Sequence, residues 1–275
     1  MGPGIGWEAV SVEDSELDPV SVETTPEALR LAWWVTAWLR GEAVTDLVLD
    51  AVIGPDATHT VSGLAALGLG GAEGVADTFV SGMGRLRTEG ATGVGVAFPA
   101  EGDPVGLGGP RAFNDAALEA GEAVVVSTSS TTGVWIGLVP VRVGAVIEWQ
   151  AYAAQRRQLP DVGEADRALR LALSESATAL AELDVARWRP EVADWLMNLR
   201  HRPSLAGAPG VPARCVELAA RGVQAREIVA VALEDEGGAV SASEMFRRRE
   251  ALVGLDRAAR RALTAAGSPE VWPPN

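Results

Sequence analysis

The sequence predicts an α+β fold, with a mixed α/β domain over residues 25–158 and an all-α helical bundle of about four helices over 159–268. Before Pro160, short runs of β-branched residues alternate with helix-like periodicity and are separated by glycine and proline. After Pro160, apolar residues repeat at helical spacing throughout. We expect the flanking segments, 1–24 and 269–275, to be tails, and the first of them to be acidic and disordered.

The front half begins with two predicted helices. Thr25 is a suitable N-cap, Pro26 fits the first helical position, and Gly41 can end the helix. A shorter helix is expected over 44–53. Trp33 lies off the apolar stripe of the first helix, so it is a candidate for an exposed position or an interface, and the alternative, which we favour, is packing in the core. That stripe consists of Leu31, Trp34, Val35 and Trp38.

The rest of the front half combines helices with strands. A long helix is predicted over 72–88, and Pro110 begins another helix that Gly121 ends. The alternating pattern of 141–149 predicts one half-buried strand. The other predicted strands cover residues 57–62, 93–98, 124–126 and 134–139.

Four helices are predicted in the back half. Pro190 and Pro212 fit first helical positions, and Ser241 with Glu244 forms a capping box before the last helix. Because the connections are short and rich in proline and glycine, we expect a compact antiparallel bundle. The predicted ranges are about 163–184, 190–199, 212–235 and 241–266.

The composition excludes several enzyme classes. All 23 basic residues are arginines, so the chain cannot form a Schiff base, attach pyridoxal phosphate, or supply the lysine of a P-loop or a protein kinase. The net charge of −14 argues against nucleic-acid binding, which requires a positive field. We therefore expect no cofactor and no nucleic-acid partner.

The sequence also predicts a cytoplasmic protein that does not enter membranes. The sequence contains no apolar run of about 18 residues, and its N-terminus lacks the basic start and apolar stretch of a secretory signal. Cys215 is the only cysteine, so no internal disulfide can form.

Few residues are available for metal binding or catalysis. The chain holds His59, His201 and Cys215, whereas a structural zinc site usually takes four such ligands. Neither a serine-hydrolase elbow nor a zinc-protease helix motif is present. We predict no metal site, name no catalytic residue, and interpret both histidines as structural.

A glycine-rich loop over 102–111 is the candidate ligand site. Glycines let the backbone approach a ligand, and the helix that follows offers free N–H groups to an anion. An arginine could clamp that anion and an aspartate could orient a hydroxyl. The alternative is a surface loop that caps a helix. The candidate residues are Asp103, Gly106, Gly108, Gly109 and Arg111.

A basic stripe on the last helix is the candidate partner site. Arg247, Arg257 and Arg261 fall within about 80° of one another at 100° per residue. They could bind a protein partner of opposite charge, including the acidic tail of another copy, with Trp33 as an additional contact. The alternatives are a solvated face or pairing with the acidic front half of the same chain.

These observations favour a non-enzymatic interaction or regulatory module over an enzyme. The acidic tail, the basic helix face and the tryptophan-rich first helix point to a protein partner or to self-association. The competing hypothesis is an enzyme or sensor that binds a small anion at the loop 102–111.

Overall fold

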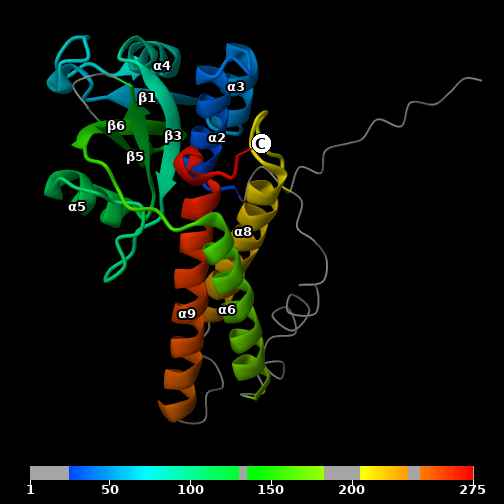
Figure 1. The fold of residues 1–275 in the computed structure, drawn as a ribbon. Coiled ribbons are helices and arrows are strands. Elements are labelled where there is room, and N and C mark those ends of the chain that lie inside the picture. Colours follow the sequence, from blue (N-terminus) through cyan, green and yellow to red (C-terminus); the bar gives the residue numbers. More distant parts are fainter. Residues whose placement is uncertain (1–24, 130–134, 183–204, 235–241, 275) are drawn as a thin grey trace, which may run out of the picture.

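The computed structural model describes residues 25–129, 135–182, 205–234 and 242–274. A mixed sheet and its surrounding helices form the front half, and three long helices extend away from it (Figure 1). The predicted α+β class is confirmed. The predicted acidic tail, residues 1–24, lies outside the described residues.

The front half is built on a six-stranded sheet in the order β2-β1-β6-β5-β4-β3. Strands β1 and β6 are parallel, and the other neighbouring pairs are antiparallel. The two-residue strand β2 has no counterpart among the predicted strands, because two residues carry no periodicity. The strands are β1 (Thr58–Ser62), β2 (Asp77–Thr78), β3 (Ala91–Ala97), β4 (Ala123–Thr128), β5 (Trp135–Val143) and β6 (Val146–Ala154).

The single strand predicted over 141–149 is wrong, because the chain turns back within it. Gly144 has a φ of 63°, and Val143 pairs with Val146 across the turn. Residues on the two sides of this hairpin alternate independently, so the sequence pattern runs through the turn without interruption. The apparent continuity of one strand therefore conceals the end of β5 and the start of β6.

Four helices accompany the sheet: α2 (Glu27–Leu39), α3 (Thr45–Ile53), α4 (Phe79–Thr88) and α5 (Arg111–Ala120). Helix α4 starts seven residues later than predicted, because Asp77 and Thr78 pair with β1. The Thr78 hydroxyl then accepts the Ser81 N–H at 3.3 Å and caps the helix. A 3₁₀ turn over Ala65–Leu67 was not expected from the sequence.

The two faces of the sheet bury two separate apolar clusters. On one face, alternate residues such as Val94, Val124 and Trp149 pack in the main core with α2 and α4. On the other face, Phe113 of α5 packs against Val125 and Val139. This alternation is the period-two pattern of a sheet that is covered on both sides.

The back half consists of the described helices α6 (Val162–Glu182), α8 (Ala213–Glu234) and α9 (Ala242–Ala266). Helix α9 packs against both of the others along its length (Figure 1). The helix predicted over 190–199 and the capping residue Ser241 lie outside the described residues. A bundle of four helices therefore stays a prediction. Among the described helices, none combines the length and the apolar character that crossing a membrane requires.

A single core joins the two halves. Leu29 of α2 and Leu263 of α9 belong to the same buried cluster, and the Trp33 Nε1–H donates to the Ala266 carbonyl at 3.2 Å. The C-terminal segment, which we expected to be a tail, instead continues as a 3₁₀ turn over Pro269–Val271 beside β3. The described residues thus share one apolar interior across the predicted boundary.

The outer edge of β3 is closed by side chains in place of another strand. The Thr36 hydroxyl of α2 donates to the Val94 carbonyl at 3.1 Å and accepts the Val94 N–H at 2.9 Å. Two residues further on, the Ser268 hydroxyl accepts the Val96 N–H at 3.3 Å. The buried Arg157 guanidinium donates to the Val96 carbonyl at 2.5 Å. These contacts occupy backbone groups through which an exposed edge would pair with another chain.

Candidate partner-binding face of helix α9

The structure joins two features that the sequence placed in separate sites. Asp103 lies in the loop after β3, and its side chain is only 6% exposed. Its carboxylate accepts a hydrogen bond from Arg261 at 2.6 Å and lies 3.1 Å from Arg260 and 3.9 Å from Arg257. The basic stripe of α9 is therefore paired in part with the acidic front half, which was one of the alternatives at the sequence level.

Arginines outnumber carboxylates at this junction. Arg260 also donates to Asp256 at 2.8 Å and to the Phe98 carbonyl at 3.0 Å, and Arg226 of α8 lies 3.8 Å from Asp256. Among the described residues, two carboxylates lie within 4 Å of four guanidiniums, those of Arg226, Arg257, Arg260 and Arg261, and a third carboxylate, that of Glu122, interacts electrostatically with Arg226. The result is a local excess of positive charge on a chain whose net charge is −14.

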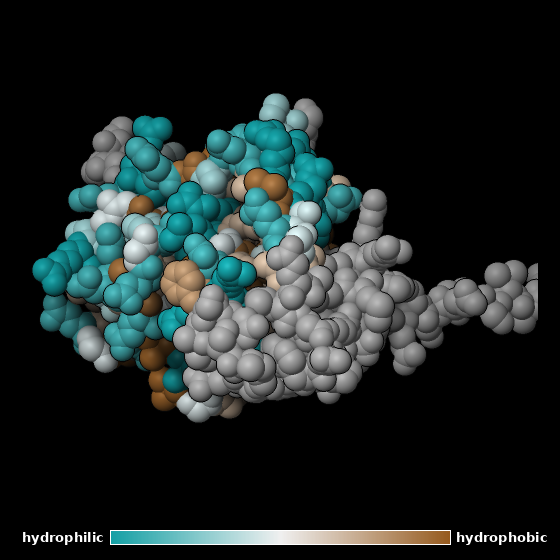
Figure 2. All heavy atoms as spheres, turned by 90° about the horizontal axis from the view of Figure 1, so that it is seen from below, coloured by the Kyte–Doolittle hydropathy of each residue, from teal (hydrophilic) through white to brown (hydrophobic). Residues whose placement is uncertain are grey.

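One side of α9 carries Arg257 and Arg261 together with exposed apolar residues. We call the residues Phe246, Glu250, Val253, Arg257 and Arg261 the α9 outer face, because they lie within about 80° of one another on the helix. Phe246 is 68% exposed and Val253 is 48% exposed. The side chains of Arg257 and Arg261 are 56% and 46% exposed. Seen from below, the described surface shows hydrophobic residues interspersed among hydrophilic ones (Figure 2).

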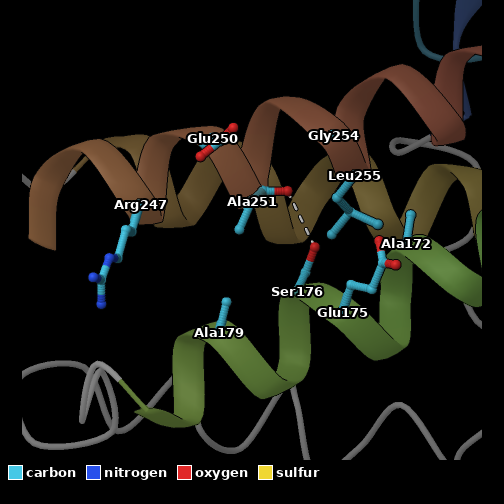
Figure 3. A pocket seen from close by; sticks show the side chains of 9 residues that line it. All are labelled: Ala172, Glu175, Ser176, Ala179, Arg247, Glu250, Ala251, Gly254 and Leu255. Carbon is cyan, nitrogen blue, oxygen red and sulfur yellow. Dashed lines mark hydrogen bonds between the residues drawn. The ribbon is translucent and has the colours of Figure 1, made fainter.

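A shallow groove of about 400 Å³ lies beside this face, between α6 and α9 (Figure 3). Small residues such as Ala172, Ala179 and Gly254 leave the groove open. Within it, the Ser176 hydroxyl of α6 donates to the Ala251 carbonyl of α9 at 3.1 Å. Arg247 reaches the groove from α9. It is ten residues, or about 15 Å, from Arg257. The structure therefore separates Arg247 from the other two predicted arginines.

The glycines of the predicted ligand loop pack against the protein's own backbone. A Cβ atom added to Gly106 would lie 2.7 Å from the Ala97 Cα, and one on Gly108 would lie 2.6 Å from the Arg156 carbonyl oxygen. Gly109 has a φ of 97°, and its added Cβ would lie 3.1 Å from the Gln155 side-chain oxygen. Close packing explains these glycines without a ligand.

The remaining predicted ligand residue, Arg111, points into solvent at the start of α5. Its side chain is 92% exposed, and its Nε–H donates to Asp115 at 3.1 Å. Asp103 pairs with α9 instead. The structure does not bring Asp103 and Arg111 to a common ionic partner.

Trp33 is buried in the core, which was the favoured alternative at the sequence level, and its assignment to an exposed or interface position is wrong. It is 1% exposed and lies in the main core between the two halves. A helix of the interior can bury more than one stripe: α2 packs against the sheet and against α3, and its Trp33 contacts Ala266 at the end of α9. Trp33 is therefore not available to a partner on this surface.

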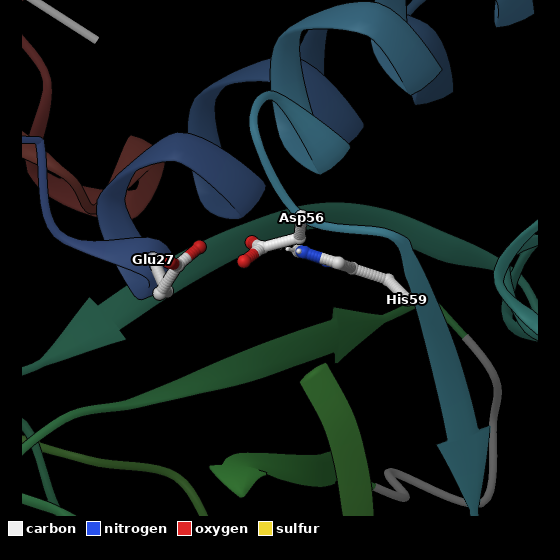
Figure 4. Close-up of side chains that lie close together, drawn as sticks. All are labelled: Glu27, Asp56 and His59. Atoms are coloured by element: carbon white, nitrogen blue, oxygen red, sulfur yellow. Dashed lines mark hydrogen bonds and ion pairs between the residues drawn. The ribbon is translucent and has the colours of Figure 1, made fainter. Parts of the chain in front are cut away.

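A second polar cluster lies at the start of α2, where ligand atoms of Glu27, Asp56 and His59 lie within 4.8 Å of one another (Figure 4). Arg142 donates to Asp56 at 2.7 Å and to Glu27 at 3.1 Å. Arg30 pairs with Glu27 and lies 3.7 Å from Asp56. Two carboxylates are thus balanced by two guanidiniums.

The hydrogen bonds of His59 do not suit a metal ligand. The Trp149 Nε1–H donates to His59 Nδ1 at 3.2 Å, so the ring proton sits on Nε2, which lies 3.0 Å from Asp56. Both nitrogens are engaged in the neutral ring. Burial lowers the pKa of His59. Burial by itself would raise the pKa of Asp56, but the hydrogen bonds from His59 and Arg142, with their charges, outweigh it and lower that pKa. We interpret this cluster as a structural ion-pair network. His201 lies outside the described residues.

The apolar members of the α9 outer face, Phe246 and Val253, were not predicted from the sequence. In the linear sequence they are ordinary helix residues, whereas the arginines form a visible charge pattern. A helical projection at 100° per residue places both on the same helix face as Arg257, so the signal was present. Their exposure could not be derived, because it depends on where α6 and α8 pack.

Comparison with known proteins identifies relatives along most of the chain. The profile of the Rv1486c-like protein N-terminal domain matches residues 28–165, and that of the Rv1486c-like protein C-terminal domain matches residues 163–264. Uncharacterized protein Rv1486c of Mycobacterium tuberculosis H37Rv is 30% identical over 90% of this chain and 98% of its own length. Uncharacterized protein MAV321 of Mycobacterium avium is 28% identical over 61% of this chain and 65% of its own.

No solved structure matches this chain significantly. Both family profiles match in chain order, and together they span the described sheet and the described long helices. The chain therefore belongs to the Rv1486c-like protein family.

Proposed function

We propose that this protein is a cytoplasmic, non-enzymatic interaction module whose α9 outer face binds an acidic protein segment. The observation that carries the proposal is the excess of guanidinium groups at Asp103, on the same helix face as exposed Val253 and, farther along α9, exposed Phe246. The titratable cluster at His59 is satisfied internally, so it offers no comparable site.

The partner must supply both charge and apolar surface. An exposed ion pair contributes only about 0–1 kcal/mol, so Arg257 and Arg261 alone give weak binding. Each Å² of apolar surface that is buried adds about 25 cal/mol, which Phe246 and Val253 can supply. The arginines also speed the encounter with an acidic partner, and salt weakens this effect.

The competing hypothesis, a small anion bound at the loop 102–111, receives no support from the geometry. Gly106 and Gly108 have no room beside them for a ligand. The Asp103 carboxylate is already occupied by arginines, and Arg111 is turned into solvent. We therefore retain the interaction module as the proposal.

The test compares two charge reversals of the same size. Arg257→Glu reverses a charge on the α9 outer face, whereas Arg111→Glu does the same on α5, where the side chain is 92% exposed. Each variant and the wild type is used to capture partners from lysate, with recovery quantified by mass spectrometry. We expect Arg257→Glu to lose a partner that both the wild type and Arg111→Glu retain. Val253→Ser should weaken the same capture. Equal recovery by all four proteins would rule out the α9 outer face.

A further inference from the structure

We infer that the occupant of the α9 outer face in the resting protein is the chain's own N-terminal segment, residues 1–24, which an external acidic partner must displace. This inference rests on the proposed function and deepens it, because it makes the interaction surface self-regulated. Four observations support it, namely charge, order along the chain, point of attachment and length.

The chemistry of the segment complements the α9 outer face. It contains six acidic residues and no arginine, opposite a helix face with exposed Arg257 and Arg261. It also carries apolar residues that could cover Phe246 and Val253. Its acids are Glu8, Glu13, Asp14, Glu16, Asp18 and Glu23, and its larger apolar residues are Ile5, Trp7, Val10, Val12, Leu17, Val20 and Val22.

The order of these residues also matches. Arg257 and Arg261 lie at the end of α9 near the sheet, whereas Phe246 and Val253 lie toward its free end (Figure 1). Five of the six acids lie in the part of the segment closest to α2, over 13–23, and Trp7 and Ile5 lie farthest from it. A segment that runs outward from the sheet along α9 therefore meets the arginines first and the apolar residues afterwards.

The segment joins the structure close to the arginines. It ends at Thr24, just before α2, and the Ala28 N–H in the first turn of α2 donates to Glu122 at 3.0 Å. Ala123, which follows Glu122, pairs with Ala97 of β3. Phe98 follows Ala97, and its carbonyl accepts the hydrogen bond from Arg260 at 3.0 Å.

The length of the segment is sufficient. Twenty-four residues span up to about 80 Å when extended, and the 25 residues of α9 span about 37 Å. Attachment to the same chain gives a short flexible segment an effective concentration on the order of millimolar. A weak, mainly electrostatic contact can therefore remain occupied in the resting protein.

Distance measurements on the full chain test the inference. Nitroxide labels are placed by Ser11→Cys and Gly254→Cys, because an added Cβ at Gly254 meets no atom within 4 Å. The native Cys215 is buried and stays unlabelled. Double electron–electron resonance should give a short-distance population that falls several-fold in about 0.5 M NaCl, where screening is strong. Arg257→Glu should deplete that population to a similar extent, whereas Arg111→Glu should leave it unchanged.

Three outcomes overturn the inference. A broad, long distance distribution in the wild type, or a short one that Arg257→Glu leaves intact, means that residues 1–24 do not lie on this face. A short distance between chains labelled at only one position each, after mixing, means that the occupant is a second copy.

These failures are distinct from failure of the proposed function. If Arg257→Glu still abolishes capture of an external partner while the label distances stay long, the α9 outer face binds partners without self-regulation. If neither capture nor distance responds to Arg257→Glu, both the proposed function and this inference fall.

Discussion

Replacing Thr36 by valine removes the hydroxyl that bonds to the edge of β3 and leaves the volume of the side chain almost unchanged. The Thr36 hydroxyl makes two hydrogen bonds, at 2.9 and 3.1 Å, with the N–H and the carbonyl of Val94, which is fully buried. The variant leaves both backbone groups without a partner, at about 1–3 kcal/mol each. Burial of the new methyl group offsets about 0.8 kcal/mol.

The expected net loss is therefore about 1–5 kcal/mol of the free energy of unfolding, or roughly 2–10 °C in Tm at about 2 °C per kcal/mol for a chain of this size. Circular dichroism during chemical and thermal denaturation measures both quantities. Thr36→Ser is the matched control, because it keeps the hydroxyl and loses only a methyl group, at about 1 kcal/mol. If Thr36→Val were as stable as Thr36→Ser, or more stable, the hydrogen bonds to Val94 would not hold this edge.

The remaining predictions concern three other buried polar groups. Arg157→Met should cost about 3–5 kcal/mol in chemical denaturation, because it removes the buried donor to the Val96 and Gly106 carbonyls as well as the ion pair with Glu270 at 2.9 Å. Glu270→Gln keeps an oxygen that can accept from Arg157, so it should cost less, and equal costs would contradict this assignment. Asp103→Asn should cost about 2–4 kcal/mol of the free energy of unfolding, because it removes the negative charge that balances the buried Arg260 guanidinium. A stability loss below about 0.5 kcal/mol would argue against the pair. Burial lowers the pKa of His59, so stability should be full above about pH 6.5 and fall below it. Denaturation curves at several pH values should show this slope in the wild type and a reduced slope in His59→Gln, and identical slopes would refute it.

Local signals in the sequence predicted most elements of the fold. Pro26 and Pro110 mark the starts of α2 and α5, and Gly121 ends α5 in the left-handed conformation. These residues act through their own backbone preferences, which do not depend on the rest of the chain. The hairpin at Gly144 was missed because Ala145 and Ile147 continue the alternation of Val141 and Val143 across the turn.

Tertiary packing decided what the sequence could not reveal. The burial of Trp33 depends on the arrival of α9, some 230 residues later, and Arg157 is enclosed by backbone carbonyls from β3 and the loop at Gly106. The basic stripe of α9 was visible, but its partner Asp103 lies more than 150 residues away in sequence. Charge and periodicity are local properties, whereas these contacts are long-range.

The most direct test of the α9 outer face is the affinity of a captured partner for two variants that change charge equally. With binding measured by isothermal titration calorimetry at about 0.1 M salt, we predict that Arg257→Glu raises the Kd at least about tenfold, equivalent to about 1.4 kcal/mol, while Arg111→Glu stays within about twofold of the wild type. Equal Kd values for the two variants would contradict the assignment of partner binding to helix α9.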